Sequence, residues 1–205
     1  MGQPYFKVRK ALTKLGVIVR SSNYELYGDM SNRLMNLLKI YCETLEIYSI
    51  DEAFVKPQHS SSCGLRNWAH NLRARIYQNL GLSIAIGVGA SKGQAKLANY
   101  LAKAMPIHAG FFDLLTTKNP DAWLEEIAIE EVWGIGRKLA FWCRLRGINT
   151  ARQLRDMPND EIKAKYGTTG VRLLYELRGQ SCLPIVLSQP KKETCVSRSF
   201  SRPIT

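Results

Sequence analysis

The chain has 205 residues, with 29 Lys or Arg against 17 Asp or Glu, so its net charge is +12. A hydrophobic content of 45% and a charged content of 22% are ordinary for a globular protein and exclude a wholly disordered chain. The basic excess favours a polyanionic partner, either nucleic acid or an anionic membrane face, although a basic surface that only binds water is an open alternative.

The N-terminal part of the sequence predicts two helices with a strand between them. Residues 1–20 have the pattern of a short helix followed by a strand at the β-branched residues 17–19. Ser22 and Glu25 have the spacing of a capping box, and apolar residues recur at helical spacing after them. We therefore expect a helix over about 23–41.

The next elements alternate between strand and helix. Residues 46–55 are rich in β-forming residues and lead into a predicted loop at about 57–64. A helix is predicted over about 66–80, where Gly81 ends it. Residues 82–88 then alternate between bulky and small side chains, as in a strand.

Ser91 is the expected N-cap of a helix over about 92–105, and residues 110–114 are a candidate edge strand. Helical patterns dominate after Asn119. The fold class predicted is therefore α+β, a sheet with helices on one face followed by a small all-helical domain, with a boundary at about residue 117.

Asp51 and Glu52 are adjacent acids inside an otherwise apolar β segment, which makes their burial costly unless something compensates it. Neighbours on a regular strand point to opposite faces, so the two side chains converge only if the chain turns there, as in a hairpin. Crowded carboxylates repel each other, and Mg²⁺ would offset that repulsion. The alternative is a turn with two solvated acids.

Lysines and glycines follow the second predicted strand. Residues 87–92 run from a strand into a helix, and small residues there allow another backbone, or a phosphate, to come close. Lys92, Lys96 and Lys103 lie along that helix. The alternative for each is a surface lysine stabilised by the helix dipole.

A second glycine turn lies in the helical half. Gly134, Ile135 and Gly136 are expected to end one helix, and Arg137 and Lys138 begin a basic one, the arrangement with which a helix-hairpin-helix motif binds DNA phosphates. A plain helical hairpin is the alternative. Residues 137–178 hold ten Lys or Arg and four Asp or Glu, a net of +6, which supports the DNA interpretation.

Cysteine and histidine residues are too scattered to predict a zinc site, and the odd number of five cysteines favours reduced thiols. No apolar run approaches the roughly 20 residues that cross a bilayer, so we expect a cytoplasmic protein without a membrane partner.

Taken in order, these motifs resemble the Y-family DNA polymerases of the UmuC type. Residues 22–33 resemble the helix before the central hairpin of that family, and residues 48–54 its catalytic signature. Residues 87–103 are similar to the next signature, residues 132–136 to the thumb hairpin, and residues 197–200 to the tether of the little finger.

The resemblance implies error-prone translesion synthesis in the SOS response, with a two-metal Mg²⁺ site for nucleotidyl transfer past damaged bases. Asp51 and Glu52 would be the catalytic metal ligands, and Lys103 would bind the triphosphate of the incoming dNTP. Lys92 and residues 134–138 would hold the DNA template–primer. A UmuD-type accessory subunit, a RecA-type filament and a sliding clamp are the further partners implied.

The resemblance also implies four regions: the end of the fingers at 1–20, the palm at 21–117, the thumb at 118–190, and the start of the tether at 191–205. A strand carrying another metal-binding Asp would precede Met1, so we expect an incomplete metal site, an exposed sheet edge or a gap in the core, and little activity of the chain alone. A non-catalytic DNA-binding module and a nucleotide cyclase are the competing functions, and a cyclase would not need the basic thumb.

Overall fold

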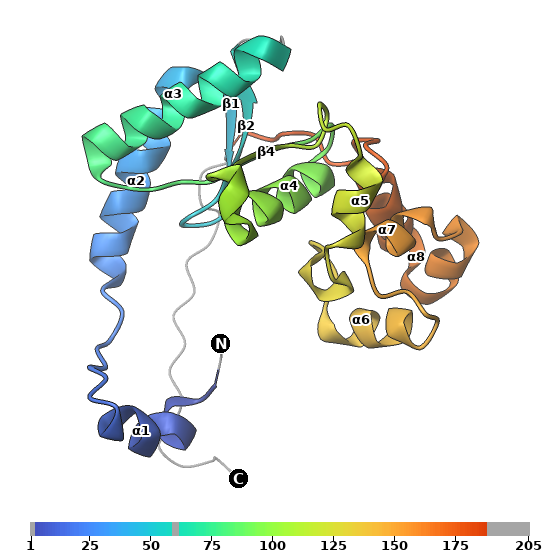
Figure 1. Ribbon diagram of the computed structural model, residues 1–205, viewed down its shortest axis with the longest axis horizontal. Helices are drawn as coiled ribbons and strands as arrows, with labels where there is room; N and C mark the ends of the chain where they lie inside the picture. Colours follow the sequence, from blue (N-terminus) through green and yellow to red (C-terminus); the bar gives the residue numbers. More distant parts are fainter. Residues whose placement is uncertain (1–2, 59–61, 188–205) are drawn as a thin grey trace.

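The computed structural model describes residues 3–58 and 62–187, and Figure 1 shows how its elements are arranged. The first helix, α1 (Tyr5–Lys14), buries no residue and lies apart from the rest of the described chain. An extended connection leads to α2 (Tyr24–Tyr41), which confirms the predicted helix. Its N-cap is Asn23 and not Ser22, because the Asn23 side chain accepts a hydrogen bond from the N–H of Leu26.

The strand predicted at residues 17–19 is wrong. These residues are not paired in a sheet, and their side chains are 47%, 77% and 45% exposed. β-Branched residues favour extended backbone, but a strand also needs a neighbouring strand, and no described segment pairs with this one.

The predicted hairpin is confirmed. Strands β1 (Cys42–Ile47) and β2 (Ala53–Pro57) pair in antiparallel register, with one irregularity between Cys42 and Thr44. Helix α3 (Ser62–Leu80) begins four residues before the predicted start and ends just before Gly81, whose φ of +67° suits glycine. Side chains from α2, β1 and α3 form the smaller of two cores, which includes Leu34, Met35, Leu38, Leu45, Leu72 and Ile76.

A strand–helix–strand unit follows. Strand β3 (Ile86–Val88) leads into α4 (Lys92–Ala104), and a short 3₁₀ turn, η1 (Pro106–His108), leads to β4 (Phe111–Asp113), which pairs with β3 in parallel. The edge strand is confirmed, but β3 is shorter than the predicted 82–88, because β4 offers only three residues to pair with. In the described chain the strands thus form two separate pairs in an α+β fold.

The remaining elements are helices, which we call the helical lobe (residues 120–177). They are α5 (Pro120–Glu125), the 3₁₀ turn η2 (Ile129–Glu131), α6 (Arg137–Arg144), α7 (Ala151–Asp156) and α8 (Asn159–Leu177), the last interrupted at Gly167.

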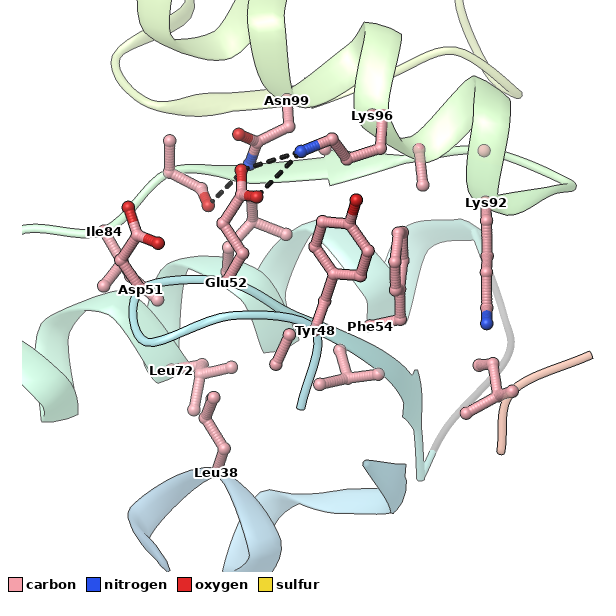
Figure 2. Close-up of a pocket in the computed structure, with 18 of the residues that line it drawn as sticks. Leu38, Tyr48, Asp51, Glu52, Phe54, Leu72, Ile84, Lys92, Lys96 and Asn99 are labelled. Atoms are coloured by element: carbon pink, nitrogen blue, oxygen red, sulfur yellow. Dashed lines mark hydrogen bonds and ion pairs between the residues drawn. The ribbon is translucent and has the colours of Figure 1, made fainter. Parts of the chain in front are cut away.

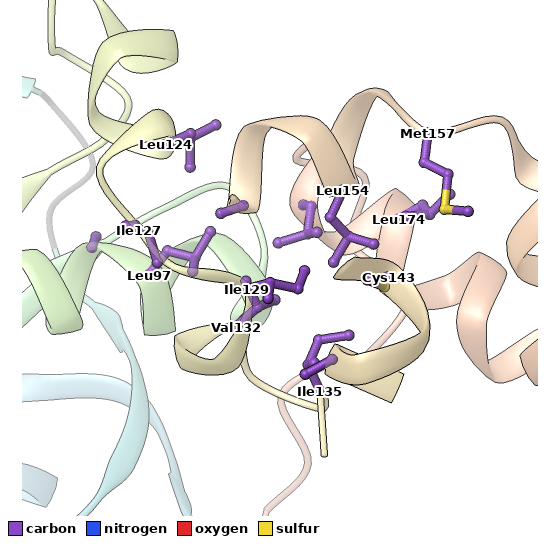
Figure 3. Close-up of a cluster of buried hydrophobic side chains, with 14 of the residues drawn as sticks. Leu97, Leu124, Ile127, Ile129, Val132, Ile135, Cys143, Leu154, Met157 and Leu174 are labelled. Atoms are coloured by element: carbon purple, nitrogen blue, oxygen red, sulfur yellow. The ribbon is translucent and has the colours of Figure 1, made fainter. Parts of the chain in front are cut away.

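The larger core joins α4 and β4 to the helical lobe. Figure 3 shows Leu97 of α4 beside Ile127 and Ile129, and the same cluster continues to Leu154 and Leu174. One continuous core therefore crosses the predicted boundary near residue 117, and the four domain limits stay a prediction. The predicted tether at 191–205 lies outside the described residues. Among the described helices, none has the length and apolar character needed to span a membrane.

Candidate active site and nucleic-acid interface

The turn between β1 and β2 brings the two predicted acids to one side. The N–H groups of Tyr48 and Ser49 both donate to the carbonyl oxygen of Glu52, at 3.0 Å, and close the turn. Consequently Asp51 and Glu52 do not alternate as on a strand, and both line the same pocket (Figure 2).

The two carboxylates have different surroundings. Asp51 is exposed, and its Oδ1 accepts a hydrogen bond from Ser49 Oγ at 2.6 Å. Glu52 is paired instead, because Lys96 Nζ lies 2.8 Å from Oε1 and 2.9 Å from Oε2. Lys103 Nζ lies 3.9 Å from Oε1 of the same carboxylate. Glu52 therefore faces basic side chains of α4 across the pocket, whereas the side-chain partner of Asp51 is Ser49 of its own turn.

The pocket has a volume of about 470 Å³ and lies between the hairpin, α2, α3, β3 and α4. Apolar side chains of both strand pairs line it, together with the polar groups of the hairpin tip and α4. Residues near the end of the described chain, Ser181, Leu183 and Ile185, complete its lining.

The glycines before α4 have a packing role. A Cβ at Gly87 would lie 2.0 Å from the backbone nitrogen of Asn99, and one at Gly89 would lie 2.5 Å from Cβ of Gln94. The small residues here were expected to let either another backbone or a phosphate come close. The structure shows the backbone of α4 in this position.

Lys92 has an intramolecular partner. Its side chain is 9% exposed, and its Nζ lies 2.7 and 2.6 Å from the carboxylate oxygens of Glu46 and 5.1 Å from the centre of the Phe54 ring. The N–H of Val186 also donates to Glu46 at 2.6 Å. Burial raises the pKa of Glu46, but these hydrogen bonds and the Lys92 charge outweigh it and lower the pKa overall. A DNA phosphate would have to break this pair in order to reach Lys92.

Sequence reasoning gave no role to Glu46 or Lys96. Lys92, Lys96 and Lys103 follow one another at i, i+4 and i+11, so they share one face of α4, and this spacing could have identified Lys96. Glu46 had no comparable signal, since its partners are 46 and 140 residues away.

The predicted glycine turn is present, but the helix before it is not. Residues 129–131 form a single 3₁₀ turn because Ile129 and Val132 are both drawn into the core, and the chain then turns at Gly134, with a φ of +90°. Ile135 is buried, and Gly136 is the N-cap of α6 without a side-chain capping bond. Arg137 and Lys138 are exposed at the start of that helix.

This turn lies against the hairpin through Trp133. The Trp133 Nε1–H donates to the Tyr48 hydroxyl at 3.0 Å, and the Trp133 ring lies 5.6 Å from that of Tyr48 and 5.7 Å from that of Phe54. The pocket wall and the basic end of the helical lobe are therefore joined by one aromatic cluster.

The donor set suits a hard divalent cation that is also bound by a substrate. Two carboxylates line the pocket at the hairpin tip, and Mg²⁺ is commonly held by one or two carboxylates together with phosphate oxygens. Among the described residues no group of three or more His, Cys, Asp or Glu side chains is placed to bind a metal. The residues present thus fit Mg²⁺ with a shared ligand set and do not form a complete protein cage.

The sequence of the chain is similar to those of known proteins. Residues 1–100 match the model of the impB/mucB/samB family. The chain is 37% identical over its full length to the protein UmuC and 35% identical to the protein ImpB, both from Salmonella typhimurium, and covers 49% of each. It thus spans about half the length of these curated relatives.

A solved structure with the same fold is a DinB family error-prone DNA polymerase from Sulfolobus solfataricus. The TM-score is 0.74 at 23% identity, over 90% of this chain and 55% of that one. Sequence and fold lead to one conclusion: residues 1–100 match the impB/mucB/samB family, the whole chain is similar to its members UmuC and ImpB, and the chain has the fold of the Y-family DNA polymerases.

Proposed function

We propose that this chain forms the palm and thumb of an error-prone translesion DNA polymerase, which adds nucleotides opposite damaged template bases. The observation that carries the proposal is the hairpin tip, where Asp51 and Glu52 line one pocket with Lys96 and Lys103 of α4. Acidic and basic groups facing each other across a pocket suit a substrate that brings phosphates and a divalent cation together.

In this proposal Asp51 and Glu52 bind the cation and Lys103 binds the triphosphate of the incoming dNTP. Bound Mg²⁺ would supply charge stabilisation at the attacking and leaving oxygens. The exposed side chain of Asp51 is directly available to Mg²⁺, whereas Glu52 must first give up its contact with Lys96. The Lys103 side chain is 56% exposed and free to extend toward a phosphate.

The helical lobe would hold the template–primer duplex. Residues 134–138 present an exposed helix start with two basic side chains, and the stretch 137–178 has a net charge of +6. Contacts of this kind are to the phosphate backbone and do not read the base sequence. We infer a positioning role for Lys92, because it holds Glu46 on the neighbouring strand. The UmuD-type subunit, the RecA-type filament, the sliding clamp and the cytoplasmic location follow from the resemblance and belong to the same proposal.

Equilibrium binding of a dNTP to the complex of the chain with a primer–template tests this function. We expect binding that requires Mg²⁺ and that weakens by about tenfold or more in Asp51→Asn and in Glu52→Gln, because each change removes a charged oxygen ligand. Both variants should keep the DNA affinity of the unmodified chain.

The converse variant, Arg137→Ala with Lys138→Ala, should weaken DNA binding and lower the slope of log affinity against log salt by about one per lost phosphate contact. Nucleotide binding that does not depend on Mg²⁺ would refute the proposed function. So would a DNA affinity that falls in Asp51→Asn and Glu52→Gln as much as in the Arg137→Ala, Lys138→Ala variant. A primer-extension assay with the same proteins then reports how much nucleotide transfer the chain supports.

A further inference from the structure

Lys96 binds the carboxylate that the proposed function gives to the cation. Its Nζ lies within hydrogen-bonding distance of both Glu52 oxygens, at 2.8 and 2.9 Å, and 5.4 Å from the centre of the Tyr48 ring. The Lys96 and Glu52 side chains are 23% and 29% exposed, so the pair is partly shielded from water. The ammonium group therefore contacts both carboxylate oxygens, at the position where a cation bound by both oxygens would lie.

A divalent cation and the Lys96 ammonium cannot both keep these contacts, because like charges at such separations repel strongly away from bulk water. We propose that Lys96 is the intramolecular counter-ion of Glu52, which a divalent cation must displace in order to bind there. The inference rests on the proposed function, since it takes Glu52 as a ligand of the cation.

The displaced ammonium remains in the pocket. Lys96 and Lys103 both line it from α4, and Lys103 Nζ already lies 3.9 Å from Glu52. Once the cation neutralises Glu52, Lys96 has no carboxylate partner and faces the space that a polyphosphate would enter (Figure 2). Cation binding thus makes a second positive charge available to the phosphates, which couples the two ligands in both directions.

The first test is the affinity of the full chain for Mn²⁺, measured from the electron paramagnetic resonance signal of the free ion. Lys96→Met removes the charge and keeps an unbranched side chain, and it should tighten Mn²⁺ binding about fivefold, the value expected for loss of one partly shielded competing ion pair. Lys96→Arg keeps the charge and should bind Mn²⁺ like the unmodified chain.

Lys103→Met is the matched control for loss of a positive charge near the site. The Lys103 ammonium is further from Glu52 than that of Lys96, and the Lys103 side chain is 56% exposed. We therefore expect the Mn²⁺ affinity of Lys103→Met to change by less than about twofold. Lys96→Gln is a second neutral variant, and circular dichroism with thermal unfolding establishes that each protein is folded before its affinity is compared.

The second test has the opposite sign. With Mn²⁺ saturating, inorganic tripolyphosphate should bind Lys96→Met about fivefold more weakly than the unmodified chain, because the released ammonium is absent. Loss of a residue that only stabilised the fold would not strengthen the binding of Mn²⁺ and weaken the binding of tripolyphosphate.

Three results bear on the inference. In a Glu52→Gln background, Lys96→Met should no longer alter Mn²⁺ affinity, which supports direct competition for that carboxylate. If Mn²⁺ binding depends on Asp51 and Glu52 but Lys96→Met behaves like Lys103→Met, the inference fails and the proposed function stands. If neither the unmodified chain nor any variant binds Mn²⁺, both fail together.

Discussion

At the scale of single residues, α4 places its lysines opposite acids of the hairpin and its turn. Lys92 pairs with Glu46 on β1, and Lys96 pairs with Glu52 at the tip, so two ion pairs tie one helix to one hairpin. The first pair is deeper, with side chains 9% and 18% exposed, and it also receives the N–H of Val186. Glu46 therefore connects three segments that are distant in the sequence.

The lowered pKa of Glu46 makes a prediction about acid stability. The folded carboxylate binds a proton at lower pH than the unfolded one, so its contribution to stability is complete above the ordinary Glu value of about 4.3 and is lost as the pH falls through the folded pKa. Glu46→Gln should thus flatten the dependence of the free energy of unfolding on pH between about pH 5 and pH 3. Urea unfolding at several pH values measures this.

Glu43→Gln provides the control, because it removes the same charge from the same strand in an ion pair with Lys56 whose side chains are more than half exposed. An equal flattening by both variants would show that Glu46 has no special part in the acid response.

At the scale of elements, α4 is held by close backbone approach at its start and by a buried carboxylate. Glu176 of α8 is 2% exposed and accepts hydrogen bonds from the N–H groups of Gly93, Cys182 and Leu183 at 2.9, 2.6 and 3.0 Å. It therefore satisfies an unpaired donor at the start of α4 and fixes the segment that completes the pocket lining.

Gly87→Ala should be strongly destabilising. The new Cβ would lie 2.0 Å from the backbone nitrogen of Asn99, so α4 must move away from β3, and we expect a loss of about 3 kcal/mol or more. Gly28→Ala is the control, because it lies inside α2 with nothing within 4 Å of the new Cβ, and it should be neutral or stabilising by up to about 1 kcal/mol. Thermal and urea unfolding distinguish the two, and similar effects at both glycines would contradict the packing argument.

The sequence was most informative about elements with strong local signals. The helix at 92–104 has a Ser91 N-cap and a following Pro106, and it was predicted to within one residue. The hairpin has acids that no regular strand could bury, so its turn was predicted, although β1 begins four residues before the predicted start. The prediction of a strand at residues 17–19 was wrong, because β-branched residues do not form a strand without a partner strand. The prediction of a helix before Gly134 was wrong, because the short apolar run there packs into the core as a 3₁₀ turn.

The residues of the candidate site could likewise be predicted only where the sequence carries a local signal. Asp51, Glu52 and Lys103 could be singled out from the sequence, and the structure brings all three to one pocket. The partner of Lys92 could not be predicted, because it depends on which strand face lies beside α4, a tertiary contact 46 residues apart. The bond from Trp133 to Tyr48 spans 85 residues and likewise has no local signal.

At the scale of the whole molecule, the chemistry and the charge occupy neighbouring parts of the fold. The acids and α4 line the pocket, while residues 137–178 carry a net charge of +6, half of the +12 of the chain, and begin with a basic helix close to the aromatic cluster of Tyr48, Phe54 and Trp133. The core that joins α4 to the lobe fixes this relation. A nucleic acid bound by the lobe would therefore end near the pocket, as template-directed addition of nucleotides requires.

The central claim is that Asp51 and Glu52 at the hairpin tip bind a divalent cation in the pocket that α4 also lines. Nuclear magnetic resonance of the ¹⁵N-labelled chain during a Mn²⁺ titration tests it most directly, because the ion broadens only the amide signals near it. We expect broadening that begins at residues 48–53 and along the pocket face of α4, and that spares α6 and α7. Broadening that begins in the helical lobe, or none at these residues at saturating Mn²⁺, would contradict it.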